Sequence, residues 1–222
     1  MEKKYKLTDE TIEFYGTKLY RIEALRDFSN VKKGDKGGFV KSEINLSHNG
    51  NCWVYDDAKV YDDATVCGNA RVLDNVEVYG NAEILDNAFI FNNAKVYDKA
   101  GVFNNAKVYG NAKVFDDVDV CGNAKVYDNA EVSGYTRICG DAEIKNDIDY
   151  IVFKNFWSSG RYFTWTRSNN KWSVGCFYGT GKELIEKAYK DSELSGKEYE
   201  RVVNYVETML KENQPIWKRN TN

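Results

Sequence analysis

The sequence has few of the residues that build metal centres, rigid linkers and membrane spans. Of its 222 residues, one is histidine and one is proline. A single histidine excludes a zinc site built from several histidines, and a single proline, Pro215, excludes a Pro-rich linker. No apolar run approaches the length needed to cross a bilayer, so no membrane partner is expected. The polar start, MEKKYKL, is unlike a signal peptide.

Cysteine is sparse and irregularly spaced. Five cysteines, an odd number without metal-type spacing, are typical of a reduced cytoplasmic protein and predict no metal and no cofactor. Cys121 and Cys139 are 18 residues apart, which allows a disulfide or a thiol metal site. Because no histidine or further ligand joins them, we expect two small packed residues instead.

Charge of one sign does not dominate the chain. The formal net charge is −3, which selects no partner. Residues 54–143 nevertheless carry 8 basic and 16 acidic side chains, and residues 150–222 carry 12 basic and 8 acidic ones. The acidic excess of residues 54–143 could make the coil a mimic of nucleic acid. It is more simply explained by the preference for aspartate at corners, and this second explanation is favoured.

What the sequence has in abundance is a six-residue repeat. Fifteen consecutive hexapeptides run from Val54 to Glu143. The first residue is Val or Ile in every unit, the fifth is small, and the third and fourth are Gly, Asp or Asn except at Lys99 and Tyr135. Apolar spacing of four and then two does not fit a helix. It places the fifth and first side chains on one side of a short strand, and the polar pair makes a corner. Three units close a triangle, so the repeat predicts a stacked coil of 18 residues.

This pattern resembles the hexapeptide-repeat family, which forms left-handed parallel β-helices. The resemblance implies a mainly β fold of about five to six triangular coils over residues 48–149. It also implies a homotrimer, since trimers are usual in the family. The fold hosts enzymes, scaffolds and binders alike. A carbonic-anhydrase-like activity would need several histidines, and an ice-binding surface would need flat threonine arrays, whereas the repeats contain only Thr65 and Thr136.

The flanks predict two further units. Residues 1–47 form a cap, with a hairpin at 11–24 and a turn into the first coil at residues 37–40, the sequence GGFV. Residues 150–222 form a small α+β domain. Strands are expected at 150–153, 161–167 and 171–178, and helices at about 182–190 and 195–212. Ser195 and Glu198 make a capping-box signature for the second helix.

The layout of the whole chain is similar to that of uncharacterised proteins of phages and prophages of gut bacteria. The strings LYRIEALRDF, GDKGGFV, NCWVYDDA and GCFYGT carry this resemblance. It implies a viral accessory role in the cytoplasm of a bacterial host, such as capturing a host protein and inhibiting antiviral defence.

The second residue of each hexapeptide faces outward and is unusually apolar. Three ladders with an 18-residue spacing result, two of them mainly aromatic and the third containing cysteines. Stacked rings would stabilise the coil by themselves, yet such stripes are more apolar than a lone rod usually exposes. We therefore expect at least one stripe to bind another subunit or a partner. The candidate residues are Tyr61, Tyr79, Tyr97 and Phe115 on one ladder, and Tyr55, Phe91, Tyr109 and Tyr127 on another.

The tail offers the best candidate ligand site. Basic and aromatic residues interleave between residues 150 and 172 without an acidic one. Arginine beside stacked aromatics on a sheet can bind nucleotides, which favours a nucleotide-like small ligand over a nucleic acid. Alternatively, the rings form the core of the small domain and the charges its rim. The candidate ligand-binding residues are Arg161, Phe163, Trp165, Arg167, Lys171 and Trp172.

No catalytic residue is assigned. His48 is the one candidate for the histidine general base of the family's acyltransferases, but it occupies an inward position of a degenerate repeat and is expected to pack or cap the coil end. The repeats also lack a long loop insertion. The sequence therefore favours a non-enzymatic oligomeric binding or scaffold protein. The alternatives are an acyltransferase-like enzyme with a site between subunits and an acidic nucleic-acid mimic.

Overall fold

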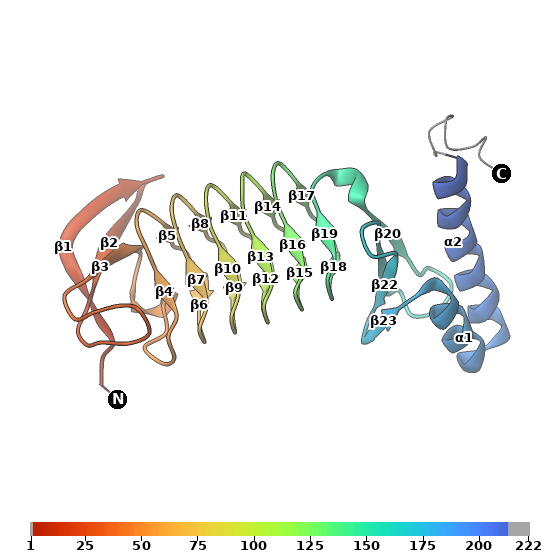
Figure 1. The fold of residues 1–222 in the computed structure, drawn as a ribbon, viewed down its shortest axis with the longest axis horizontal. Helices are drawn as coiled ribbons and strands as arrows, with labels where there is room; N and C mark the ends of the chain where they lie inside the picture. Colours follow the sequence, from red (N-terminus) through yellow and green to blue (C-terminus); the bar gives the residue numbers. More distant parts are fainter. Residues whose placement is uncertain (1, 213–222) are drawn as a thin grey trace.

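The computed structural model describes residues 2–212 and shows a β-solenoid of parallel coils between two caps (Figure 1). A β-hairpin lies against the N-terminal end, and a small sheet with two helices lies against the C-terminal end. Pro215 lies outside the described residues. The prediction of a mainly β fold built from stacked coils is confirmed, and the sheets give about six coils.

Three parallel sheets form the sides of the solenoid. The first face contains β3 (Lys36–Val40), β5 (Lys59–Val60), β8 (Glu77–Val78), β11 (Lys95–Val96), β14 (Lys113–Val114) and β17 (Glu131–Val132). The second face contains β4 (Trp53–Val54), β7 (Arg71–Val72), β10 (Phe89–Ile90), β13 (Lys107–Val108), β16 (Lys125–Val126) and β19 (Glu143–Ile144). The third face contains β6 (Thr65–Val66), β9 (Glu83–Ile84), β12 (Gly101–Val102), β15 (Asp119–Val120) and β18 (Arg137–Ile138).

The register of these strands follows the 18-residue period. Lys59 pairs with Glu77 and Val60 with Val78, and the same offset recurs from coil to coil. The first and fifth residues of the hexapeptides fill the interior, where their alternating large and small side chains are fully or almost fully buried. Burial of these side chains is the main favourable contribution to the fold.

The third residue of the repeat forms the corner. Aspartate, asparagine or glycine there has a positive φ, for example 57° at Asp98 and 70° at Gly68. These residue types occupy the left-handed region at the smallest cost. Most corners are closed by a turn in which the backbone N–H of the fifth residue donates to the carbonyl oxygen of the second, as from Ala58 to Tyr55 at 3.1 Å.

Asparagines at the fourth position stack into amide ladders. Asn75 Nδ2 donates to Asn93 Oδ1 at 3.2 Å, and Asn93 Nδ2 donates to Asn111 Oδ1 at 3.1 Å. A second ladder runs from Asn51 to Asn123 at another corner. Each exposed amide therefore donates a hydrogen bond to the amide on the next coil, and these bonds link neighbouring coils outside the sheets.

The predicted N-terminal hairpin is present, as β1 (Tyr5–Phe14) and β2 (Thr17–Ala24). The GGFV segment is not a turn, however. It belongs to β3, which pairs antiparallel with β2 and parallel with β5. Its glycines are needed for close approach, because a Cβ on Gly38 would lie 2.5 Å from the carbonyl oxygen of Ala58. β3 thereby joins the hairpin to the first face in one sheet.

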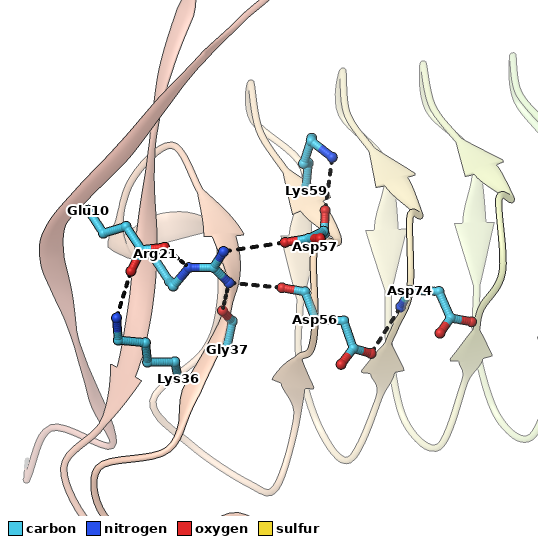
Figure 2. Close-up of polar contacts among 8 residues, drawn as sticks. All are labelled: Glu10, Arg21, Lys36, Gly37, Asp56, Asp57, Lys59 and Asp74. Atoms are coloured by element: carbon cyan, nitrogen blue, oxygen red, sulfur yellow. Dashed lines mark hydrogen bonds and ion pairs between the residues drawn. The ribbon is translucent and has the colours of Figure 1, made fainter.

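Arg21 on β2 fastens the hairpin to the first corner of the solenoid (Figure 2). Its guanidinium donates to the carbonyl oxygens of Gly37 at 2.9 Å and Asp56 at 3.0 Å, and it pairs with Asp57 and Glu10. It also lies 4.1 Å from the ring centroid of Phe39. Most of the side chain is shielded from solvent, so these contacts hold the hairpin in one position over the first face.

Both ends of the solenoid have side chains that satisfy open backbone groups. At the N-terminal end, the short 3₁₀ segment Glu43–Asn45 presents the Asn45 amide to the carbonyl oxygens of Ala64 and Asp62. At the C-terminal end, the last coil is followed by the 3₁₀ segment Asp147–Asp149. Hydroxyl oxygens of Thr164 and Ser168 there accept from backbone N–H groups of β18 and β19. These contacts cap edges that would otherwise recruit further strands.

The C-terminal sheet has two different faces. Its strands are β20 (Tyr150–Lys154), β21 (Tyr162–Thr166), β22 (Lys171–Val174) and β23 (Phe177–Gly179), all antiparallel. The sequence predicted one strand over 171–178; the chain instead turns back at Gly175, where φ is 56°. Thr164 contacts the solenoid, whereas Phe163 and Trp165 on the same strand point into a core with the helices. Side chains along this strand thus alternate between the solenoid and the helices.

Two helices cover the aromatic side of that sheet (Figure 1): α1 (Gly181–Asp191) and α2 (Glu193–Glu212). The predicted capping box at Ser195 is wrong, because α2 begins two residues earlier and Ser192 Oγ accepts from the backbone N–H of Ser195 at 3.1 Å. A capping box that the sequence analysis missed starts α1, where Thr180 and Glu183 satisfy each other's backbone N–H groups.

Cys121 and Cys139 form a disulfide, which corrects the expectation of two packed thiols. They occupy the second position on neighbouring coils of the third face, where the coil spacing brings their Cα atoms to 4.7 Å. That separation lies within the range that a disulfide requires. The stacking of neighbouring coils thus brings the two cysteines into the geometry of a disulfide. The number and spacing of cysteines in the sequence did not predict this bond.

The corner geometry predicts that replacement by alanine has different costs at two glycines with the same backbone conformation. Gly110 and Gly134 both have a φ of 74°, but a Cβ at Gly110 would lie 2.8 Å from the backbone nitrogen of Asp128, whereas a Cβ at Gly134 meets nothing within 4 Å. Gly134→Ala should lower the free energy of unfolding by about 1–2 kcal/mol. Gly110→Ala should lower it by roughly a further 1–3 kcal/mol because the next coil must move. Equal losses in denaturant unfolding would contradict the stacked-corner account.

Candidate functional site

The N-terminal hairpin and the first face border an open groove of about 330 Å³. This volume lies within the roughly 300–1,000 Å³ range of small-molecule sites. Residues from the hairpin tip and from three successive coils line it: Tyr15, Thr17, Tyr61, Asp62, Glu77, Tyr79 and Lys95. We call this site the hairpin groove.

Packing of the hairpin onto the aromatic ladder creates the groove. Phe14 contacts Tyr61 edge to face, with centroids 5.7 Å apart, and Leu19 and Phe39 complete a small buried cluster with Tyr61. Tyr15, next to Phe14, is 80% exposed. One wall is therefore anchored in a core, while the ring at its tip remains free to contact a ligand.

The aromatic side of the groove is a regular stack. Tyr61 and Tyr79 have ring centroids 5.1 Å apart, Tyr79 and Tyr97 4.8 Å, and Tyr97 and Phe115 4.9 Å, all nearly parallel. Tyr61 is buried beneath the hairpin, and the three rings beyond it are half-buried. The ladder thus continues from the groove onto an uncovered strip of the first face.

The polar side of the groove is an ion pair. Lys95 Nζ lies 2.9 Å from Glu77 Oε1, and the Glu77 side chain is only 14% exposed. Both residues occupy the sixth position of the repeat on neighbouring strands, β11 and β8, so the strand register sets their separation. The carboxylate can accept a proton from a bound ligand, and the ammonium can bind a polar or anionic group of that ligand.

Burial controls the ionisation of the groove tyrosines. It raises the pKa of Tyr79 to about 12, with smaller contributions from the neighbouring Tyr97 and Glu77. Burial also raises the pKa of Tyr61 well above its usual value. Both phenols are therefore neutral hydrogen-bond donors at physiological pH and are unsuited to act as bases.

The second predicted stripe also forms a ladder. On the second face, Phe91 stacks on Tyr109 at 4.7 Å and Tyr109 on Tyr127 at 5.2 Å. Tyr55, at the start of this face, instead donates from its hydroxyl to Asn30 Oδ1 at 2.8 Å. Both stripes are outward and partly exposed, as the sequence predicted, but only the first contributes to a groove with the hairpin.

The predicted tail site is divided between core and surface. Phe163, Trp165 and Trp172 are at most 2% exposed and pack beneath the helices, as the alternative interpretation proposed. Arg161 and Arg167 are exposed. Arg161 borders a cavity of only about 60 Å³, and Lys171 lies at the end of β22. The structure therefore does not bring the three rings and the charges to one accessible surface.

His48 lies at the N-terminal cap, outside the groove lining. Its Nδ1 accepts from the backbone N–H of Lys4 at 3.2 Å, and its ring stacks on Tyr5 with centroids 4.4 Å apart. Its Nε2 is buried, 3.6 Å from a carboxylate oxygen of Glu43. The sequence prediction that this residue packs at the coil end agrees with these contacts.

Sequence reasoning found the ladder tyrosines of the groove but missed Tyr15, Thr17, Asp62, Glu77 and Lys95. The pairing of Glu77 with Lys95 could have been found, because residues 18 apart at the sixth position must be neighbours on adjacent coils. The contribution of Tyr15 could not, since it depends on where the hairpin packs.

Neither a metal centre nor a membrane-spanning helix is found in the part of the chain that the structure describes. Among residues 2–212, no three His, Cys, Asp or Glu side chains are grouped so that they could hold a metal ion. None of the helices there has the length and apolar character needed to cross a membrane.

Comparison with known proteins finds a partial similarity. No protein-family model matches the chain. Over 76 residues, the chain is 38% identical to a protein of Escherichia coli (strain K12) named "Uncharacterized acetyltransferase YdcK". The match covers 30% of this chain and 23% of that protein, so the chain spans less than a quarter of this relative. Together with the β-solenoid, this similarity fits a hexapeptide-repeat β-helix and gives no support to the resemblance to phage proteins.

The raised pKa of Tyr79 predicts a loss of stability at high pH. The phenol titrates near pH 10 in an unfolded chain and near 12 in the fold, so its contribution is complete below pH 10 and declines as the pH rises towards 12. The wild-type free energy of unfolding should therefore fall between about pH 9 and pH 11.5, and the fall should be smaller in Tyr79→Phe. Denaturant titrations at both pH values measure this, and an identical fall in both proteins would contradict it.

Proposed function

We propose that this chain is an acyltransferase-like hexapeptide-repeat protein that binds an acyl donor in the hairpin groove. The similarity to a protein named as an acetyltransferase carries this proposal. It favours the enzymatic alternative over the non-enzymatic binding or scaffold role that the sequence alone suggested. A phage origin and an anti-defence role receive no support from the same comparison.

The chemistry of the groove fits such a donor. A thioester of coenzyme A carries a planar base, phosphates and an extended apolar arm. The Lys95 ammonium can donate a hydrogen bond to the thioester carbonyl oxygen, and the ladder rings can contact the base or the arm. The groove is open towards the uncovered part of the ladder.

Glu77 is the residue of the groove best placed to accept a proton from an attacking acceptor. Its side chain is largely buried, and the ion pair with Lys95 keeps it oriented. Asp62, the other carboxylate of the groove, forms a corner, where one of its side-chain oxygens accepts from the backbone N–H of Gly80 at 3.4 Å. We assign Glu77 the role of general base and Lys95 that of donor binding.

A second candidate function is ligand binding without turnover. One observation favours it: His48, the sole histidine, is held in the N-terminal cap by Lys4 and Tyr5 and does not line the groove. In this case the groove would retain an acyl donor or a similar nucleotide-containing ligand without transferring the acyl group.

Acyl transfer can be measured as the release of coenzyme A from acetyl-CoA with a panel of small amine, alcohol and sugar acceptors. Chromatographic detection avoids interference from the protein's own thiols. Removal of a general base typically lowers the rate by about 100-fold or more, so Glu77→Gln should lower transfer to that extent and leave the circular dichroism spectrum unchanged.

Glu131→Gln provides the matched control. Glu131 also occupies the sixth position on the first face and pairs with Lys113 at 2.6 Å, but it lies outside the groove lining. This variant should transfer at the wild-type rate. Binding of acetyl-CoA without transfer to any acceptor would favour the second candidate function. Unchanged transfer by Glu77→Gln would overturn the role assigned to Glu77.

We further propose that the chain self-associates through the uncovered part of the first ladder, with a trimer as the expected assembly. The half-buried rings of Tyr97 and Phe115 support this, since they continue from the groove onto a surface that no element of the described chain covers. A second copy docked there would complete the open side of the groove. No host protein is needed to explain this surface.

Sedimentation velocity tests the proposed assembly. The wild-type protein should sediment as an oligomer, and Tyr97→Glu should shift it to the monomer because a charge would be buried in the contact. Phe103→Glu, a change of a half-buried ring at the same repeat position on the third face, is the control and should leave the oligomer intact. A monomeric wild-type protein, or dissociation by both changes, would contradict the proposal.

A further inference from the structure

A fully buried lysine contacts a fully buried cysteine at the N-terminal end of the solenoid. Lys4, which immediately precedes β1, and Cys52, which immediately precedes β4, both have no solvent exposure. Lys4 Nζ lies 3.2 Å from Cys52 Sγ and donates to the carbonyl oxygen of Cys52 at 2.8 Å. The two residues are 48 positions apart in sequence, so folding of the cap onto the first coil creates this contact.

The amine of Lys4 has no acidic partner. Its neighbours Lys3 and Lys6 pair with Glu43 and Glu23, whereas Lys4 forms no ion pair among residues 2–212. Its other recorded contacts are the carbonyl oxygen of Gly50 at 3.5 Å and the ring of Phe28, whose centroid is 5.2 Å away. Burial of an unpaired ammonium is costly, which favours the neutral amine.

Burial favours the uncharged form of both groups. It lowers the pKa of the Lys4 amine, while the contact with Cys52 opposes this effect and the nearby Arg26 adds to it. A neutral amine has a free electron pair and can react with an oxidised sulfur. Burial also raises the pKa of the Cys52 thiol, while the nearby Lys4 opposes this rise, so the pair is held as amine and thiol in contact and away from water.

We propose that Lys4 and Cys52 form an oxidation-dependent crosslink in which one oxygen atom bridges the lysine nitrogen and the cysteine sulfur. The oxidant is molecular oxygen, a small apolar molecule that can enter a dry interior. One N–H bond and the S–H bond break, and their two hydrogens leave in water. The second N–H bond of the amine stays intact. The O–O bond breaks, and N–O and O–S bonds form. Nitrogen and sulfur each lose two electrons, and dioxygen gains four.

This crosslink would fasten the start of β1 to the first coil. Crosslinks that close a long loop stabilise a fold mainly by restricting the unfolded chain. It would act on the same cap that carries one wall of the hairpin groove, but it does not depend on the proposed acyl transfer. Two equivalents of a dithiol would reverse it, restoring the amine and the thiol and releasing water.

Intact mass spectrometry and peptide mapping of the full-length wild-type protein, kept in air or under argon, test the proposal. The air-exposed protein should gain about 14 Da, one oxygen less two hydrogens, rather than the roughly 16 or 32 Da of a sulfenic or sulfinic acid. Digestion should yield one species joining the peptides that contain Lys4 and Cys52. Dithiothreitol should remove the mass gain, and it should lower the thermal midpoint of the wild-type protein by several degrees more than that of Cys52→Ala, in which only the Cys121–Cys139 disulfide is left to reduce.

Two variants identify the bridging atoms. Cys52 occupies the fifth position of a degenerate repeat, where alanine is the common residue, so Cys52→Ala should fold and lose the mass gain. Lys4→Met, which keeps the chain length and removes the amine, should lose it as well. Cys176, an exposed thiol in the C-terminal sheet region, is the internal control and should form no link to a lysine. Absence of the joined peptide after exposure to air, or a gain of only sulfur-bound oxygen at Cys52, would overturn the proposal.

Discussion

The left-handed corner at the third residue of each repeat is the constraint on which the rest of the structure depends. It turns the chain from one face of the coil to the next at fixed intervals, so that the first and fifth side chains always enter the interior. The same interval sets every outward neighbour. It stacks the asparagine amides and the tyrosine rings, and it brings Glu77 to Lys95 and Cys121 to Cys139. Surface chemistry is therefore a direct consequence of backbone periodicity.

The strength and locality of that periodicity explain how much could be predicted. Coil period, interior residues, outward ladders and the N-terminal hairpin follow from residue spacing alone. Features that depend on packing between segments did not follow. Gly38 serves close approach rather than a turn, Ser192 rather than Ser195 starts the last helix, and the hairpin groove exists only because Phe14 packs on Tyr61. Each of these requires distances across the fold that one sequence does not contain.

The two caps use the same principle on different elements. Asn45 at one end and Thr164 at the other present side-chain polar atoms to the open edges of the coil. The C-terminal sheet can do this because its two faces differ, with hydroxyls towards the solenoid and Trp165 towards the helices. The aromatic residues that suggested a ligand site are thus needed for the cap. This leaves the N-terminal hairpin, which covers the start of the first ladder, as the element that forms the groove proposed as a binding site.

We propose that a ligand binds where the hairpin covers the first tyrosine ladder. Amide hydrogen exchange of the intact protein, with and without saturating acetyl-CoA, tests this proposal. We expect added protection around Tyr15 and Thr17 and in the coils of Tyr61 and Tyr79, with the C-terminal helices unchanged. Protection confined to the C-terminal sheet and helices, or no protection anywhere at saturation, would contradict it.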